Sequence, residues 1–130
     1  MSKLILTIAA IAIFYGINAQ PNLVPNNSFE VIDSCPSTVS QLRFAQPWFS
    51  PSLGTPDVYN ACSGLLGVPD NLLGYENART GIGYAGIGIH GNIGTNREYI
   101  AVKLNEPLKK YMYYCFTIYC SLRIYFMKPI

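Results

Sequence analysis

Residues 98–122 read EYIAVKLNEPLKKYMYYCFTIYCSL, and this stretch decides the expected fold. Residues 98–104 and 113–122 both alternate their side chains with the two-residue period of a strand. The residues that share one face are Ile100, Val102 and Leu104 in the first half, and Phe116, Ile118, Cys120 and Leu122 in the second. Residues 106–110 supply the turn, so the stretch predicts an antiparallel hairpin.

The rest of the chain favours short strands and loops. Nine prolines and eleven glycines interrupt any helical period. Residues 83–89 are expected to form a strand, and residues 41–45 and 48–49 an extended region. Residues 50–71 are rich in turn formers and predict an ordered loop. Strands without intervening helices predict an all-β fold, a sandwich or jelly roll.

The N-terminus has the pattern of a helical secretory signal peptide. Lys3 provides a positive charge, residues 4–15 are apolar, and Ala19 ends a small-residue cleavage site before Gln20. The apolar run is shorter than the ~20 residues that span a bilayer, so no transmembrane helix is expected after cleavage. Residues 1–19 are therefore expected to be a leader, and the protein to be exported.

Charge excludes one class of partner. Without Lys3 the chain has eight basic and seven acidic residues, a net charge of +1. Nucleic-acid binders usually gather their positive charge on one face. Here Lys109 and Lys110 are the only adjacent pair, so no nucleic-acid partner is expected.

Four cysteines follow the leader, and export permits disulfides. Three pairings are possible, and sequence alone does not choose among them. Cys115 and Cys120 lie five residues apart in an expected strand, which puts their side chains on opposite faces. Cys35 and Cys62 lie in turn-rich segments, so we favour a Cys35–Cys62 disulfide. A zinc site is disfavoured because no C-x-x-C occurs and His90 is the only histidine.

Several segments resemble the galactose-binding-like β-sandwich of carbohydrate-binding modules. Residues 22–30, NLVPNNSFE, look like its opening strand. Residues 79–86 resemble its small-residue strand, and residues 97–122 its central hairpin. The ordered series SCP at 34–36, PWF at 47–49, GTPD at 54–57, YNAC at 59–62 and GVP at 67–69 is similar to an exported Gram-negative envelope family.

Those envelope proteins often carry the module ahead of an outer-membrane-protein-A-like domain or a type IX secretion sorting tail. The resemblance covers residues 20–122, whereas residues 123–130 do not continue it. The family's glycine before the last hairpin strand is replaced by Lys110, Tyr111 and Met112. The expectation is an incomplete jelly-roll sandwich, truncated relative to the family, with a divergent tail.

The resemblance implies a non-enzymatic envelope or surface module that binds a glycan, peptidoglycan or an envelope protein. Alternatives are a structural or adhesion subunit without a ligand site, and an ancillary module of a secreted hydrolase. The location implied is the periplasm, outer membrane or surface of a Gram-negative bacterium. In the resembling superfamily the opening strand often helps to hold a structural calcium ion, which makes Asn26 and Glu30 candidate ligands.

Aromatic residues are the candidate ligand-binding groups, because exposed rings stack on sugar faces. The candidates are Trp48, Tyr59 and Tyr84. Residues 81–86 match G-x-G-x-x-G, but further glycines at Gly88 and Gly91 disfavour the helix that a dinucleotide site needs. No spacing marks a pair of catalytic carboxylates or a nucleophile, so no catalytic residue is predicted.

Overall fold

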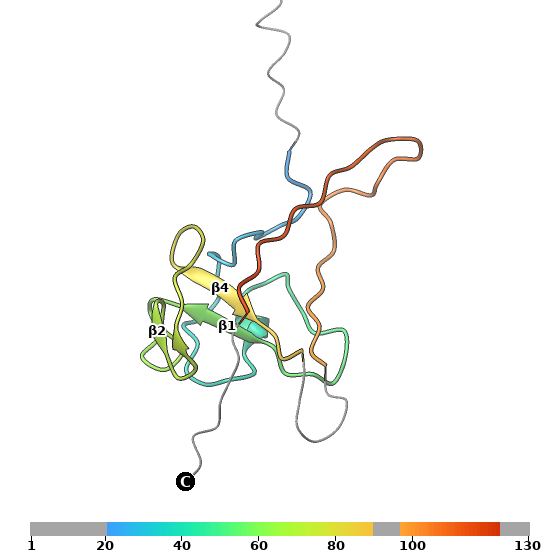
Figure 1. The fold of residues 1–130 in the computed structure, drawn as a ribbon. Coiled ribbons are helices and arrows are strands. Elements are labelled where there is room, and N and C mark those ends of the chain that lie inside the picture. Colours follow the sequence, from blue (N-terminus) through green and yellow to red (C-terminus); the bar gives the residue numbers. More distant parts are fainter. Residues whose placement is uncertain (1–20, 90–96, 123–130) are drawn as a thin grey trace, which may run out of the picture.

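The computed structural model describes residues 21–89 and 97–122 (Figure 1). The expected leader, His90 and the tail at 123–130 lie outside these residues. Within the described ranges the chain forms four short strands and one turn of 3-10 helix: η1 (Leu42–Phe44), β1 (Asp57–Asn60), β2 (Asp70–Asn71), β3 (Gly74–Tyr75) and β4 (Gly83–Gly86). The small antiparallel sheets agree with the all-β class.

The central sheet consists of β1 and β4, which run antiparallel with Asp57 opposite Gly86 and Tyr59 opposite Tyr84. The expected strand at 83–89 is thus confirmed over its first four residues. The position of β1 corrects the prediction of an ordered loop at 50–71. Val58 and Tyr59 favour a strand because they pack on a pleated surface, but they lie between a proline and an asparagine that signal turns.

A second antiparallel pair joins β2 to β3, with Asp70 opposite Tyr75 and Asn71 opposite Gly74. The Asn71 side chain organises the turn, because its Oδ1 accepts a hydrogen bond from the Leu73 N–H at 3.0 Å. Gly74 follows with a φ of 124°, a backbone conformation that glycine adopts readily. The turn residues that suggested a loop therefore build a small hairpin.

The core is small and lies where η1 meets β1. Its apolar members are Leu42, Ala45, Val58, Tyr59 and Leu66. The residues of η1 were expected to be extended. Instead the Ala45 N–H donates to the Leu42 carbonyl, which closes the turn, and the Leu42 N–H donates to the Pro56 carbonyl. The compact turn buries Leu42 against the central sheet.

The expected hairpin of residues 98–104 and 113–122 is not formed. Phe49 and Ala101 exchange two backbone hydrogen bonds, of 3.0 and 2.9 Å, and this isolated bridge is the only β pairing in these two stretches. The chain beyond residue 104 leaves the body as a long loop and then returns (orange to red in Figure 1). Alternation shows that a sequence suits a sheet, but a two-stranded hairpin is marginal unless its apolar face is covered.

A disulfide joins Cys35 to Cys62, as predicted, with Cα atoms 5.9 Å apart. It ties the segment before η1 to Cys62, which lies two residues after the end of β1. Cys115 and Cys120 are free and exposed. In the part of the chain that the structure describes, no helix has the length and apolar character to cross a bilayer.

Replacing both bonded cysteines, Cys35→Ser with Cys62→Ser, is expected to lower the free energy of unfolding by about 3 kcal/mol, because it frees a long loop in the unfolded chain. Urea denaturation measures the change. The matched control is Cys115→Ser with Cys120→Ser, which removes two exposed thiols and is expected to leave stability unchanged. Equal losses in the two double variants would contradict a stabilising role for the Cys35–Cys62 bond.

Candidate functional site

Asn26 holds the opening segment in place. Its side-chain nitrogen donates to the carbonyls of Val31 (2.8 Å) and Gln46 (3.0 Å), and its oxygen accepts from the Val31 N–H at 3.0 Å. Its backbone has a φ of 43°, a left-handed conformation that asparagine tolerates better than most residues. The amide that sequence reasoning assigned to calcium therefore satisfies backbone groups from two segments.

Glu30 braces the start of β4. Its Oε1 accepts hydrogen bonds from the N–H groups of Ile82 and Gly83, both at 3.1 Å, and its Oε2 accepts from Ile82 at 3.0 Å. Gly81 makes this approach possible, because its φ is 65° and an added Cβ would lie 2.3–2.5 Å from the carboxyl group. The first three residues of the glycine-rich motif, Gly81, Ile82 and Gly83, thus lie against a carboxylate of the protein itself.

These contacts bear on the calcium prediction. Calcium prefers six to eight oxygen ligands. Within residues 21–89 and 97–122, no group of three histidine, cysteine, aspartate or glutamate residues could hold a metal. The side-chain oxygens of Asn26 and Glu30 already accept hydrogen bonds from backbone N–H groups. This arrangement suits a structural role better than cation binding. Calcium binding here stays a prediction.

Glu98 forms a second brace. Its Oε1 accepts from the N–H (3.0 Å) and the hydroxyl (2.9 Å) of Thr55, and its Oε2 accepts from the Gly88 N–H at 2.7 Å. The Glu98 N–H also donates to the Gly88 carbonyl. One side chain therefore joins the segments before β1 and after β4. Sequence reasoning placed Glu98 at the start of a strand, and no local pattern distinguished it from other surface acids.

The three candidate ligand-binding rings fall into two groups. Tyr59 and Tyr84 stack on each other across the central sheet, with centroids 4.7 Å apart and planes 15° from parallel. Trp48 instead packs on Phe29 with a centroid distance of 4.9 Å, and its Nε1 donates to the Asn26 carbonyl at 2.8 Å. The structure does not gather the three rings into one platform.

Exposure separates these rings further. Tyr59 is only 3% exposed, so its faces are not available to a sugar. Trp48 and Tyr84 are half-buried, and the Tyr84 hydroxyl accepts a hydrogen bond from the Asn71 amide at 2.9 Å. Ligand binding by these residues stays a prediction, with Trp48 and Tyr84 as the members that retain accessible surface.

The pKa of the Asp57 carboxyl group is raised above its ordinary value. Burial disfavours its charge and raises its pKa, and the nearby charge of Glu98 acts in the same direction. Hydrogen bonds from the Ser40 N–H and the Tyr59 hydroxyl oppose this rise. Both oxygens of Asp57 thus have donors within the protein, which is typical of a structural acid.

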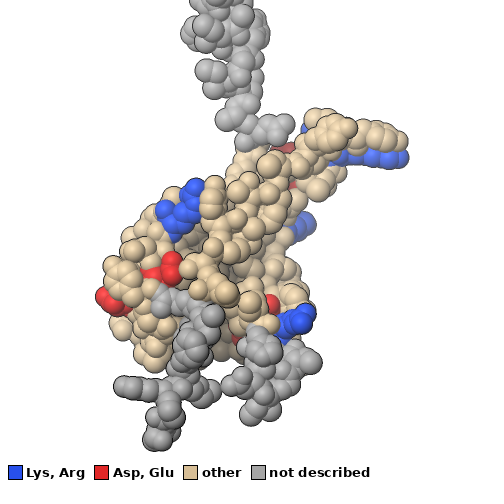
Figure 2. Space-filling view, viewed as in Figure 1, with Lys and Arg blue, Asp and Glu red and all other residues tan. Residues whose placement is uncertain are grey.

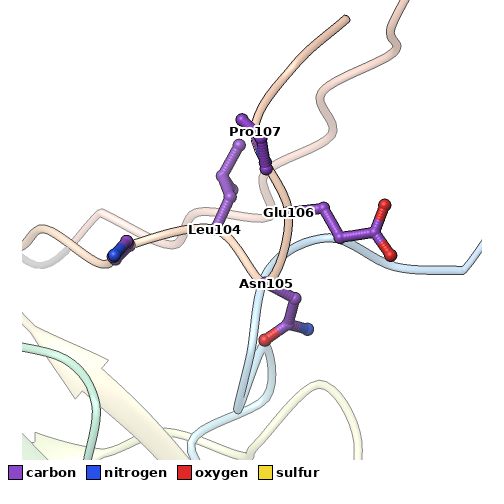
Figure 3. A pocket seen from close by; sticks show the side chains of 5 residues that line it. Leu104, Asn105, Glu106 and Pro107 are labelled. Atoms are coloured by element: carbon purple, nitrogen blue, oxygen red, sulfur yellow. The ribbon is translucent and has the colours of Figure 1, made fainter.

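Residues 103–107 line a shallow hollow at the surface (Figure 3). The side chains of Leu104 and Pro107 extend toward the same side, whereas Glu106 and Asn105 point in other directions. The Asn105 N–H donates to the Leu23 carbonyl at 2.9 Å and fixes this turn to the opening segment. Because one short segment supplies all the lining residues, the hollow does not bring together groups from different parts of the fold.

Charge is dispersed on the face shown in Figure 2. Lysine and arginine side chains lie in small separate groups, with uncharged surface between them. This distribution agrees with the scattered positive residues of the sequence.

No protein-family model, curated protein or solved structure was found to match the chain.

Glu30→Ala is expected to lower the free energy of unfolding by about 2 kcal/mol, because hydrogen bonds to a charged acceptor are lost and the N–H of buried Gly83 is left without its acceptor. Glu30→Gln, which keeps one acceptor oxygen, should lose less. Chemical denaturation measures both. Glu106→Ala, at an exposed acid, is the control and should be neutral. If the Glu30→Ala variant were as stable as this control, the stabilising role of the Glu30 hydrogen bonds would be refuted.

Proposed function

We propose that the chain is an exported, non-enzymatic module of a Gram-negative cell envelope that acts by binding. The disulfide between Cys35 and Cys62 carries the proposal. Such bonds form and persist outside the cytosol and are rare within it. The signal-peptide pattern of residues 1–19 supports the same compartment independently.

The non-enzymatic part of the proposal is supported by the carboxyl groups. Glu30 and Glu98 accept hydrogen bonds from backbone N–H groups, and Asp57 accepts from a backbone N–H and a tyrosine hydroxyl. Catalytic carboxyls need to face a cleft and a substrate. In the described ranges these three acids instead hold the chain together.

We propose that the fold is an incomplete galactose-binding-like jelly-roll sandwich, because residues 20–122 resemble the modules that have this fold. Its ligand is a glycan, peptidoglycan or an envelope protein. Half-buried Trp48 and Tyr84 are the rings that we assign to a sugar-containing ligand, since Tyr59 is buried.

Expression of the full sequence in a Gram-negative host tests the location. The expected product begins at Gln20, has Cys35 bonded to Cys62 and fractionates with the envelope. A chain without residues 1–19 is the control and should stay in the cytoplasm with Cys35 and Cys62 reduced. An uncleaved, reduced, cytoplasmic product of the full sequence would refute export.

The ligand is tested with the same purified protein and isolated peptidoglycan sacculi. Retention on sacculi is expected, and Trp48→Ala should weaken it, whereas Phe49→Ala at the exposed neighbouring ring should not. The disulfide state and melting temperature show whether each variant is folded. Absence of retention on sacculi would contradict the peptidoglycan ligand and favour a structural subunit.

A further inference from the structure

A long loop projects from the body of the protein, and its tip is defined here as residues 108–113. Figure 1 shows this loop (orange to red) extending away from the central sheet before the chain returns. Every residue of the tip is exposed. Tyr111 is 87% exposed and Tyr113 is 98% exposed, and Leu108 and Met112 are more than half exposed. The tip is therefore a convex surface that carries large side chains into solvent.

The tip is built as a tight turn. The Met112 N–H donates to the Lys109 carbonyl at 3.4 Å, and Tyr111 between them has a φ of 65°. The Tyr114 hydroxyl accepts a hydrogen bond from the Lys109 N–H at 2.8 Å and closes the turn. A positive φ suits glycine and is uncommon for a bulky residue. The turn itself would therefore favour glycine at residue 111, and local folding does not explain the exposed ring.

Positive charge coincides with this ring. Lys109 and Lys110 are adjacent and exposed, and the Lys110 ammonium nitrogen lies 4.8 Å from the centre of the Tyr111 ring. No acidic residue occurs from Pro107 to Leu122. Figure 2 shows positively charged side chains along the lower side of the projecting loop, beneath uncharged ones. The tip thus joins two unneutralised lysines to exposed aromatic and aliphatic side chains.

These side chains match the surface of an anionic bilayer. Lysine attracts anionic lipid headgroups, and tyrosine is enriched at the level of the headgroups. Leu108 and Met112 suit the boundary between headgroups and acyl chains. A fluid bilayer also closes around a convex tip, whereas a protein partner would need a surface of complementary shape. We infer that residues 108–113 bind the protein to membranes that contain anionic phospholipids.

This surface is separate from the rings proposed to bind a sugar. Trp48 packs on Phe29, and Tyr84 belongs to β4, so both lie in the body and not in the projecting loop. Each lysine close to an anionic surface strengthens binding about fivefold. Two lysines with a few partly inserted side chains therefore give weak, reversible membrane binding.

Sedimentation with vesicles tests the inference, using protein whose Cys35–Cys62 bond is formed. Binding to vesicles of phosphatidylglycerol and phosphatidylcholine is expected to be at least about tenfold stronger than binding to phosphatidylcholine alone, and salt should weaken it. Lys109→Ala with Lys110→Ala should lower the partition coefficient about twentyfold. Arg97→Ala with Lys103→Ala removes the same charge at two exposed residues outside the tip. This matched control should change the coefficient about twofold at most.

A second variant separates membrane contact from folding. Tyr111→Gly places glycine at the positive φ, so the melting temperature should not fall. The partition coefficient should nevertheless fall about fivefold, because partial burial of an aromatic ring is lost. Tyr75→Ser, at an exposed tyrosine of β3, is the control and should leave binding unchanged. Trp48→Ala should also leave vesicle binding unchanged, which distinguishes this surface from the proposed glycan site.

Three results would overturn the inference. Absence of binding to the anionic vesicles would exclude the bilayer as the partner and would leave the proposals of export and glycan binding untouched. Equal losses in the two double variants would show that overall charge, and not the tip, governs binding. A Tyr111→Gly chain that melts at a lower temperature and binds vesicles as before would assign the ring to folding.

Discussion

Two carboxylate groups hold this fold together where a larger sheet would otherwise do so. Glu30 reaches across more than fifty residues of sequence to the N–H groups at the start of β4. Glu98 joins the segment before β1 to Gly88. Both acids therefore fix the ends of the central β1–β4 pair, and the irregular segments around it depend on them. Charge-assisted hydrogen bonds suit this role because they are stronger than neutral ones.

The remaining stability comes from a small core and one covalent link. Among the described residues, the core around η1 and β1 consists of Leu42, Ala45, Val58, Tyr59 and Leu66. The Cys35–Cys62 bond ties the segment before η1 to the residues just after β1. Small domains with limited cores commonly rely on disulfides in this way. Residues 113–122 contribute little to this core, because their large apolar side chains remain exposed.

Features set by neighbouring residues could be predicted from the sequence, whereas features set by contacts between distant residues could not. Cys35–Cys62 and the strand at Gly83–Gly86 were predictable, because turn context and small-residue patterning are local. The strand at Asp57–Asn60 was hidden by flanking turn residues, and Leu42 was expected in an extended segment. The predicted hairpin at 98–122 was wrong, because alternation of apolar and polar side chains does not show whether another layer covers the apolar face. The structural roles of Glu30 and Glu98 were missed, because the N–H groups that donate hydrogen bonds to them lie far away in the sequence.

Amide hydrogen exchange followed by NMR tests the central claim most directly. If the carboxylates hold the sheet ends, the N–H groups of Ile82, Gly83 and Gly88 should exchange as slowly as those paired between β1 and β4. The N–H groups of residues 113–122, which have no backbone acceptor among the described residues, should exchange quickly. Fast exchange at Ile82, Gly83 and Gly88 beside protected β1–β4 amides would contradict the account.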